Sequence, residues 1–257
     1  MNTFRTADGA ELSYDERGAR GDLPLLFLHG WNGASALWEP IVERLAKNHR
    51  TIALDLRGFG ASSGAPGPYR VETFSDDLSA LIMAADLDPL VVIGHSMGAA
   101  VAQRFAVDRP DAVEGLVLIA PVPAGGLNYS PKMDAMFRSL PGNRDATNAW
   151  LARLTHREPS ADVREALRRA AAAVHPGAAL ESYESWSTLD FADEAATIAT
   201  PTLVIAPDGD RPEFARAHVG DLIAGSTFQI LRESGHYAIV EQPERIARLI
   251  EHFVASL

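Results

Sequence analysis

The sequence of 257 residues contains no cysteine. This absence excludes disulfide bonds, thiolate nucleophiles and metal sites built on cysteine. The chain also lacks any apolar run close to the roughly 20 residues that a membrane-spanning helix needs. The N-terminal stretch, Met1–Gly9, has no apolar segment of the kind found in a secretory signal peptide. We therefore expect a soluble, cytoplasmic protein that does not span a membrane.

Positive charge is scarce as well. The 23 Lys and Arg residues face 34 Asp and Glu residues, so the formal net charge is -11. Because binding to a phosphate backbone needs a basic face, this balance argues against a nucleic-acid partner. No group of His, Asp and Glu has the spacing of a metal site, so we expect neither a metal ion nor another cofactor. The apolar content of 47% is typical of a globular protein.

Short apolar runs and helical patterns alternate along most of the chain. A hairpin around Asp8-Gly9 and six further runs predict strands, and the segments between most of them have helical periodicity. The predicted strands are Phe4–Thr6, Glu11–Asp15, Leu23–Leu28, Thr51–Leu56, Leu90–Ile93, Leu116–Ala120, Thr202–Ala206 and Thr227–Leu231. The predicted helices are Trp38–Lys47, Val71–Ala85, Ala99–Val107 and Glu244–Val254. This alternation predicts an α/β fold whose mostly parallel sheet is covered by helices on both faces.

The alternation stops between about Val122 and Thr200, where no convincing strand occurs. Four helical segments punctuated by proline and glycine fill this stretch: Pro131–Leu140, Ala146–Leu154, Ser160–Val174 and Ala178–Leu189. An all-helical insertion in an α/β pattern is most simply a cap, or lid, over one end of the sheet. We therefore divide the chain into a core, residues 1–121 and 200–257, and a helical cap, residues 122–199.

A serine stands between two glycines at Gly94-His95-Ser96-Met97-Gly98, directly after an apolar run. The pattern G-x-S-x-G is typical of a sharp strand-to-helix turn that exposes a nucleophilic serine, and the glycines are needed because side chains do not fit there. A serine hydroxyl is a weak nucleophile, so Ser96 needs a base. His236, in the loop after the predicted strand Thr227–Leu231, is the best candidate because it lies at the same edge of the sheet.

An acid that orients the base is expected at another strand end. Asp208 and Asp210 both follow the predicted strand Thr202–Ala206; we prefer Asp210 and keep Asp208 as the alternative, since Asp-Gly is common in solvated turns. An oxyanion site needs two backbone N–H donors. Met97 supplies one as the residue after the nucleophile, and Trp31, in the turn that begins at His29, is the natural second donor.

These features together resemble the α/β-hydrolase superfamily over essentially the whole chain. The resemblance is carried by His29-Gly30-Trp31, by Asp55–Ser62, by Gly94–Gly98, by Pro201–Asp210 and by Gly235-His236, in the family's order of Ser, Asp and His. It implies an eight-stranded sheet that is antiparallel only at its second strand, with a cap inserted after the sixth. It also favours Asp210 as the acid, although Pro207 stands where the family often has glycine.

The predicted chemistry is acyl transfer to water through the triad Ser96, Asp210 and His236, with Trp31 and Met97 as the oxyanion hole and no metal. We predict a serine hydrolase of the carboxylesterase or lactonase type, and carbon–carbon bond hydrolysis remains open. The alternatives are a non-hydrolytic enzyme on the same fold, such as a haloperoxidase-like perhydrolase, a lyase or a cofactor-free oxygenase, and a small-molecule receptor that retains the triad.

The cap is expected to shape the substrate site. Some of its apolar and aromatic side chains should line a cavity above Ser96 and favour an apolar or aromatic ester-type substrate, although most should form the cap core; they are Met133, Met136, Phe137, Trp150, Leu151, Tyr183 and Trp186. Four cap arginines could contact an acidic carrier protein, but a solvated helix face is the simpler interpretation: Arg138, Arg144, Arg153 and Arg157. No oligomeric state follows from the sequence.

Overall fold

The computed structural model describes residues 1–19 and 23–257, which contain an eight-stranded sheet in the order β1-β2-β4-β3-β5-β6-β7-β8. The strands are β1 (Asn2–Arg5), β2 (Glu11–Arg17), β3 (Leu25–Leu28), β4 (Thr51–Leu54), β5 (Leu90–His95), β6 (Val113–Ile119), β7 (Thr202–Pro207) and β8 (Thr227–Leu231). The strand β2 runs antiparallel to both of its neighbours, β1 and β4, and all other neighbouring pairs are parallel. The predicted α/β-hydrolase fold is confirmed.

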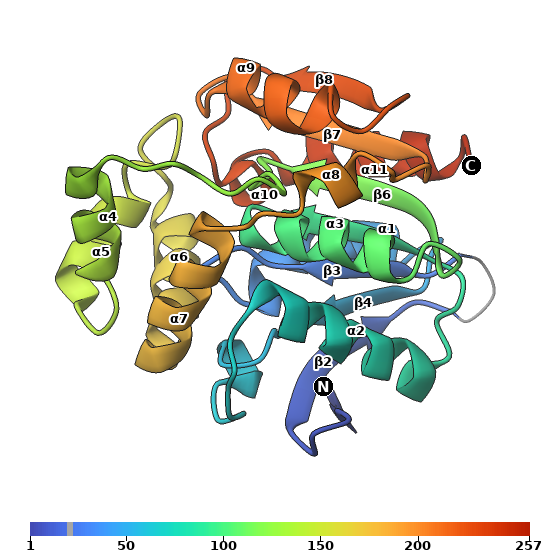
Figure 1. Ribbon diagram of the computed structural model, residues 1–257, viewed down its shortest axis with the longest axis horizontal. Helices are drawn as coiled ribbons and strands as arrows, with labels where there is room; N and C mark the ends of the chain where they lie inside the picture. Colours follow the sequence, from blue (N-terminus) through green and yellow to red (C-terminus); the bar gives the residue numbers. More distant parts are fainter. Residues whose placement is uncertain (20–22) are drawn as a thin grey trace.

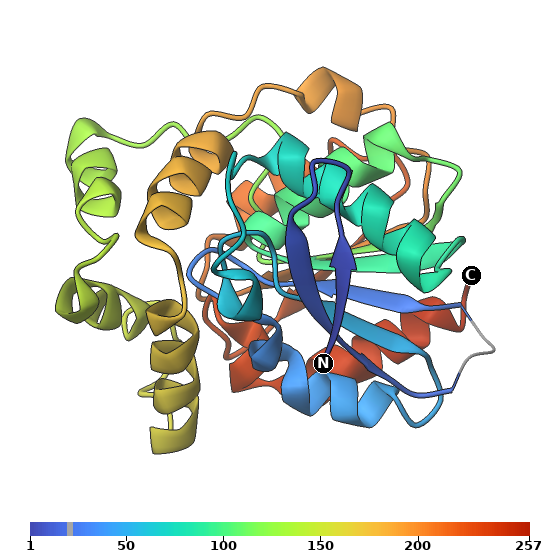
Figure 2. The ribbon, with the colours of Figure 1, turned by 90° about the horizontal axis from the view of Figure 1, so that it is seen from below.

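Helices cover both faces of the sheet (Figures 1 and 2). Helices α1 (Glu39–Leu45) and α11 (Pro243–Val254) lie on one face, and α2 (Val71–Ala85) and α3 (Met97–Asp108) lie on the other. The central strands β3, β4 and β5 are buried along their whole length, which explains their continuous apolar sequences. The register pairs Leu28 with Gly94, so β3 and β5 end level with each other at the carboxyl edge.

Five helices and no strand occupy residues 122–199, which are all described: α4 (Pro131–Arg138), α5 (Arg144–Leu151), α6 (Ala161–Ala172), α7 (Pro176–Ser187) and α8 (Ala192–Ala195). The side chains of Ser130, Asn143 and Ser160 accept backbone N–H groups at the starts of α4, α5 and α6. In Figures 1 and 2, α4 to α7 stand together beside one end of the sheet, whereas α8 lies against the α/β body.

Several element boundaries differ from the sequence prediction. The predicted strand Thr51–Leu56 ends at Leu54, because the carboxylate of Asp55 accepts the amides of Ser35 and Ala61 at 2.6 and 2.8 Å and turns the chain into a loop. Helix α3 starts at Met97 rather than at Ala99, directly after the turn. Short elements that had no periodic signal are η1 (Ser35–Trp38), η2 (Gly60–Ser62), α8, α9 (Pro212–Ala215), η3 (Arg216–Gly220) and α10 (Ala238–Glu241).

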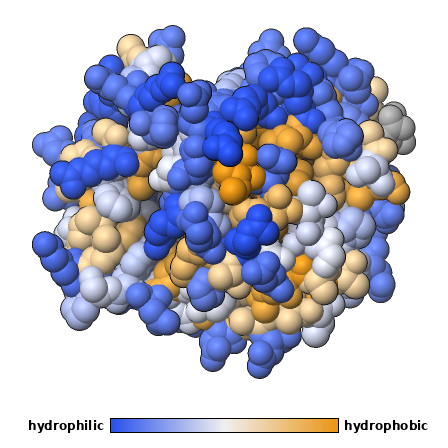
Figure 3. Space-filling view, turned by 90° about the horizontal axis from the view of Figure 1, so that it is seen from above, coloured by the Kyte–Doolittle hydropathy of each residue, from blue (hydrophilic) through white to orange (hydrophobic). Residues whose placement is uncertain are grey.

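In the part of the chain that the structure describes, no helix combines the length and the apolar character that crossing a membrane requires. The face shown in Figure 3 is mostly hydrophilic at its rim, and hydrophobic side chains gather near its centre.

Candidate active site

Ser96 occupies a strained turn between β5 and α3. Its φ of 54° and ψ of -117° lie in a region that residues with a side chain rarely adopt, at a cost of about 1–3 kcal/mol. A Cβ on Gly94 would lie 2.3 Å from the carbonyl oxygen of Gly98, and a Cβ on Gly98 would lie 2.4 Å from that of Leu28. Because these neighbours are backbone atoms, both positions require glycine, and the turn holds Ser96 out at the carboxyl edge of the sheet.

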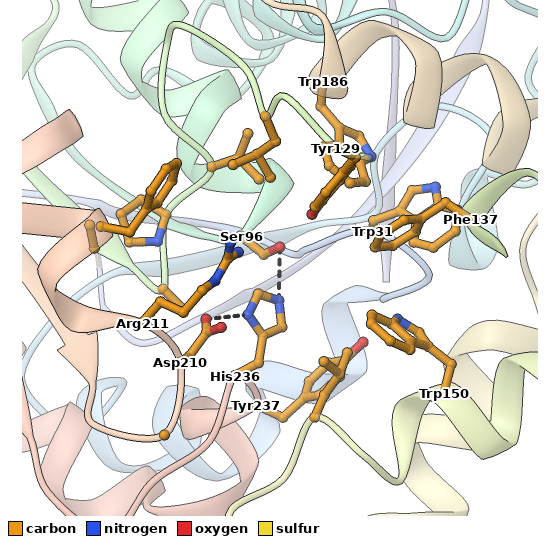
Figure 4. Close-up of a pocket in the computed structure, with 18 of the residues that line it drawn as sticks. Trp31, Ser96, Tyr129, Phe137, Trp150, Trp186, Asp210, Arg211, His236 and Tyr237 are labelled. Atoms are coloured by element: carbon orange, nitrogen blue, oxygen red, sulfur yellow. Dashed lines mark hydrogen bonds and ion pairs between the residues drawn. The ribbon is translucent and has the colours of Figure 1, made fainter. Parts of the chain in front are cut away.

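A continuous hydrogen-bonded chain joins three side chains from three strand ends. The Nε2 atom of His236 lies 3.0 Å from the Oγ atom of Ser96, and its Nδ1 atom lies 2.7 Å from Oδ2 of Asp210 (Figure 4). Burial alone would raise the pKa of Asp210, but the charge and hydrogen bond of His236, together with Arg211, hold this pKa below its usual value. Asp210 is therefore ionised at neutral pH and accepts the Nδ1 proton, which leaves Nε2 free to face the serine hydroxyl.

Asp208 has a different set of partners. Its carboxylate accepts the backbone amides of Glu233 at 3.0 Å and Ser234 at 3.2 Å, and these bonds hold its pKa below the usual value. The structure thus brings Asp210, and not Asp208, to His236. Asp208 instead ties the loop after β7 to the loop that carries His236.

His95 lies beside the serine but points toward the backbone of the histidine loop. Its ring centre is 5.0 Å from that of His236, and its Nε2 atom lies 2.8 Å from the carbonyl oxygen of His236. Burial lowers the pKa of His95 to about 3, so the ring is neutral and Nε2–H donates this bond. His95 therefore does not occupy the position of a base; it holds the His236 backbone in place.

The turn after β3 lies against the serine. The ring of His29 bridges this turn, donating from Nδ1 to the carbonyl of Gly30 at 2.9 Å and accepting the amide of Leu56 on Nε2 at 3.1 Å. A Cβ on Gly30 would come within 2.9 Å of the Cβ of Ser96, so the two turns are in close contact. The Trp31 amide lies in this turn, and in residues 1–19 and 23–257 it has no backbone acceptor.

The other predicted oxyanion donor is Met97, the first residue of α3, where a backbone amide has no acceptor within its own helix. The side chain of Trp31 serves a further purpose, because its indole N–H donates to the carbonyl of Ala179 in α7 at 2.8 Å. The turn beside Ser96 is therefore anchored to the helical segment 122–199.

A cavity of about 380 Å³ opens above Ser96 (Figure 4). Side chains from the helical segment line it together with residues that follow β3, β6, β7 and β8, and most of them are apolar or aromatic. Of the seven segment residues considered above, five line this cavity: Met133, Phe137, Trp150, Leu151 and Trp186. Tyr183 instead stacks on Phe137 and donates its hydroxyl to Asp134 at 2.8 Å, as part of the packing between α4 and α7.

The lining residues that were not identified from the sequence include Tyr129, Arg211 and Phe214. They lie in loops or short elements that have no periodicity, so the sequence contained no pattern to indicate them. Burial raises the pKa of Tyr129 to about 12, which keeps its hydroxyl protonated. Two of the four arginines considered for a carrier protein form ion pairs on the surface: Arg138 with Asp134 and Glu184, and Arg157 with Glu233.

This sheet order, with a serine on a strained turn after β5 and an acid and a histidine after later strands, defines the class of the α/β hydrolases. The family model described as "alpha/beta hydrolase fold" matches residues 24–243, and the chain belongs to this family.

Named relatives include both hydrolases and haloperoxidases. A Mycobacterium tuberculosis protein named "Putative non-heme bromoperoxidase BpoC" is 31% identical over 264 residues, covering 96% of this chain and 98% of that protein. The 2-hydroxymuconate semialdehyde hydrolase of Pseudomonas sp. strain CF600 is 28% identical over 97% of this chain and 92% of its own length. A solved thermophilic esterase from Thermogutta terrifontis is 27% identical, with a TM-score of 0.84 over 99% of this chain and 98% of its own.

Proposed function

We propose that this protein is a serine hydrolase that cleaves a carboxylic ester or a related acyl bond through an acyl-enzyme. The observation that carries the proposal is the hydrogen-bonded chain from Asp210 through His236 to Ser96, which ends at the floor of a largely apolar cavity. A histidine held 3.0 Å from a serine hydroxyl can accept its proton during attack on a carbonyl carbon.

The mechanism follows from these positions. Ser96 attacks the carbonyl carbon while Nε2 of His236 takes the hydroxyl proton, and the backbone amides of Trp31 and Met97 stabilise the negative charge on the carbonyl oxygen. His236 then returns the proton to the leaving alcohol, and the ester bond breaks. A water molecule, deprotonated by the same histidine, attacks the acyl-enzyme and releases the carboxylic acid and Ser96.

We infer a helical cap over residues 122–199, since side chains of α4, α5 and α7 line the cavity above Ser96. Their aromatic character supports a small-molecule substrate with an apolar or aromatic part. In this proposal the cap selects the substrate, and the α/β core supplies the chemistry.

The proposal is tested with nitrophenyl esters, lactones and vinylogous diketones on the wild type and on Ser96→Ala. We expect Ser96→Ala to lose about 10³-fold or more of kcat and to resist labelling by a fluorophosphonate. Ser234→Ala is the matched control, because its hydroxyl is buried without a partner in the described structure and its loss should leave turnover unchanged. Full turnover by Ser96→Ala would refute the nucleophile, and ligand-induced stabilisation without any turnover would favour a receptor.

The relative named as a bromoperoxidase supports a second candidate, a perhydrolase activity of the same site. Here hydrogen peroxide, in place of water, attacks the acyl-enzyme, and the products are a peracid and free Ser96. Peracid formation from a carboxylic acid and peroxide, measured by bromide oxidation, distinguishes this activity from simple hydrolysis. It too should disappear in Ser96→Ala.

A further inference from the structure

Arg211 is the single lysine or arginine among the described side chains that line the cavity above Ser96. It follows Asp210 in the loop after β7, and Figure 4 shows its guanidinium group directed toward Ser96. The remaining walls are mostly aromatic and aliphatic, so the cavity combines an apolar body with one positively charged side chain. The carboxylate of Asp210 also lines it, but that group is directed to His236 at 2.7 Å.

The guanidinium of Arg211 forms no ion pair with a described residue, although its charge contributes to the lowered pKa of Asp210. Among residues 1–19 and 23–257, no Asp or Glu oxygen lies within the 4.0 Å that defines an ion pair with it. Its guanidinium carbon lies 5.1 Å from the centre of the Phe214 ring, and its charge also acts on the nearby hydroxyl of Tyr129, where it opposes the effect of burial on the pKa. Arg57 is a useful contrast, because that buried arginine is held by Asp77 and Asp8. Two aspartates thus neutralise the charge of Arg57, whereas the guanidinium of Arg211 is directed into the site without an ion-pair partner among the described residues.

The backbone at Arg211 is also unusual. Its φ of 48° and ψ of 59° place it in the left-handed region, which favours glycine and asparagine over arginine. Its carbonyl accepts the amides of Phe214 and Ala215 at 3.0 and 3.2 Å, so the residue is fixed at the start of α9. A long charged side chain thus occupies a position whose backbone conformation disfavours it, a combination that is common at functional sites.

Arg211 stands where the cavity meets water. Four residues line both the cavity above Ser96 and a neighbouring open hollow of about 330 Å³: Leu127, Tyr129, Arg211 and Phe214. The side chain of Arg211 is exposed. A ligand whose apolar part fills the aromatic cavity could place a charged end at this boundary and keep part of its hydration, which avoids the cost of burying an ion in an apolar site.

We propose, on the basis of the function proposed above, that the natural substrate is an anionic ester or lactone. An apolar or aromatic part occupies the cavity, and a carboxylate pairs with the guanidinium of Arg211. The planar guanidinium offers two parallel N–H donors to a carboxylate, and such charge-assisted bonds are stronger than bonds between neutral groups. In this arrangement Arg211 is a specificity residue that binds and orients the substrate and takes no part in proton transfer.

The test compares esters that carry a free carboxylate with esters of the same shape in which a neutral amide replaces that carboxylate. One pair carries the charge on the acyl side, phenyl hydrogen adipate against phenyl adipamate. The other carries it on the alcohol side, 3-carboxyphenyl butanoate against 3-carbamoylphenyl butanoate. Arg211→Asn removes the cation while suiting the left-handed backbone, and Arg211→Lys restores the charge. Arg216→Asn is the matched control, since Arg216 is one turn away, rests on the Phe228 ring and does not line the cavity.

For at least one pair, we expect Arg211→Asn to lower kcat/KM for the ester with the free carboxylate by about 10- to 100-fold. The kcat/KM for the neutral ester of that pair should change by less than about threefold. Arg211→Lys should recover part of the difference, and Arg216→Asn should behave as the wild type. The inference would be overturned if Arg211→Asn left the ratio of kcat/KM between the two members of each pair unchanged, whether neither ester or both esters lost activity.

A parallel assay of Ser96→Ala separates this inference from the proposed function. If Ser96→Ala hydrolyses these esters as well as the wild type does, the proposed function fails. If turnover needs Ser96 but shows no dependence on Arg211, the proposed function stands and the anionic substrate does not. Trp31, Trp150 and Trp186 line the cavity, so quenching of tryptophan fluorescence by free adipate reports carboxylate binding without turnover. The quenching is measured on Ser96→Ala with and without Arg211→Asn.

Discussion

Replacing Asp210 by asparagine removes one negative charge from the hydrogen-bonded chain and changes almost nothing in size. In the proposed mechanism His236 becomes an imidazolium, and the Asp210 carboxylate lies 2.7 Å from its Nδ1 atom. With an effective dielectric constant of about 20, two unit charges at that distance attract each other by about 6 kcal/mol. The imidazolium charge is spread over the ring, which reduces the loss of transition-state stabilisation to about 4 kcal/mol, or about 10³-fold in kcat.

The asparagine amide adds a second effect. If its NH₂ group donates to Nδ1, the imidazole proton moves to Nε2, and Nε2 can no longer accept the Ser96 proton. We therefore expect Asp210→Asn to reduce kcat by about 10³- to 10⁴-fold with a small change in KM. The assay is steady-state hydrolysis of a nitrophenyl ester, together with the rate of fluorophosphonate labelling.

Asp208→Asn is the matched control, because it makes the same change two residues away. Asp208 accepts the amides of Glu233 and Ser234, and an asparagine carbonyl can keep one of these bonds. We expect a loss of kcat below about threefold and a drop in the free energy of unfolding of about 1 kcal/mol. Equal losses of kcat in the two variants, or a larger loss in Asp208→Asn, would refute the assignment of Asp210 as the orienting acid.

Three further predictions concern other parts of the structure. Gly98→Ala should lower the free energy of unfolding by about 1–3 kcal/mol in urea titrations, because its Cβ meets backbone atoms, whereas Gly64→Ala, which faces open space, should change it by less than about 0.5 kcal/mol. Trp31→Phe removes the donor to the carbonyl of Ala179 and should lower kcat/KM of ester hydrolysis by about tenfold, with a melting temperature reduced by a few degrees; unchanged kinetics would exclude a link between α7 and the turn beside the serine. Burial lowers the pKa of His95 from 6.5 to about 3, so between these values the unfolded chain binds a proton that the folded chain does not. The free energy of unfolding should therefore fall by about 1.4 kcal/mol for each pH unit of acidification through this window, and His95→Gln should show a slope smaller by this amount in denaturant titrations at each pH.

Much of the fold could be predicted from the sequence because its signals are local. The apolar runs of β3 and β5 are buried on both faces, and such strands have continuous apolar sequences whatever lies around them. The sharp turn at Ser96 needs glycine on both sides for steric reasons within a few residues of the chain. The sequence also predicted that the serine, the aspartates and His236 follow strands, and it showed their order directly.

Other features depend on contacts between residues far apart in the chain. Asp208 and Asp210 both follow β7, and the sequence favoured Asp210 without excluding Asp208. In the loop after β8, His236 is hydrogen-bonded to Asp210, and the backbone amides of Glu233 and Ser234 donate to Asp208. The path of that loop depends on its packing against the rest of the protein, and no local pattern encodes it.

The cavity shows the same division. That a helical segment with apolar and aromatic side chains follows β6 could be predicted from the sequence, because helical periodicity and proline or glycine punctuation are local properties. Which faces of its helices line the cavity, and the position of Arg211 at the boundary between the cavity and water, depend on the packing of the folded chain. A helix must bury its apolar face somewhere, but the partner of that face is set by the packing of the whole chain.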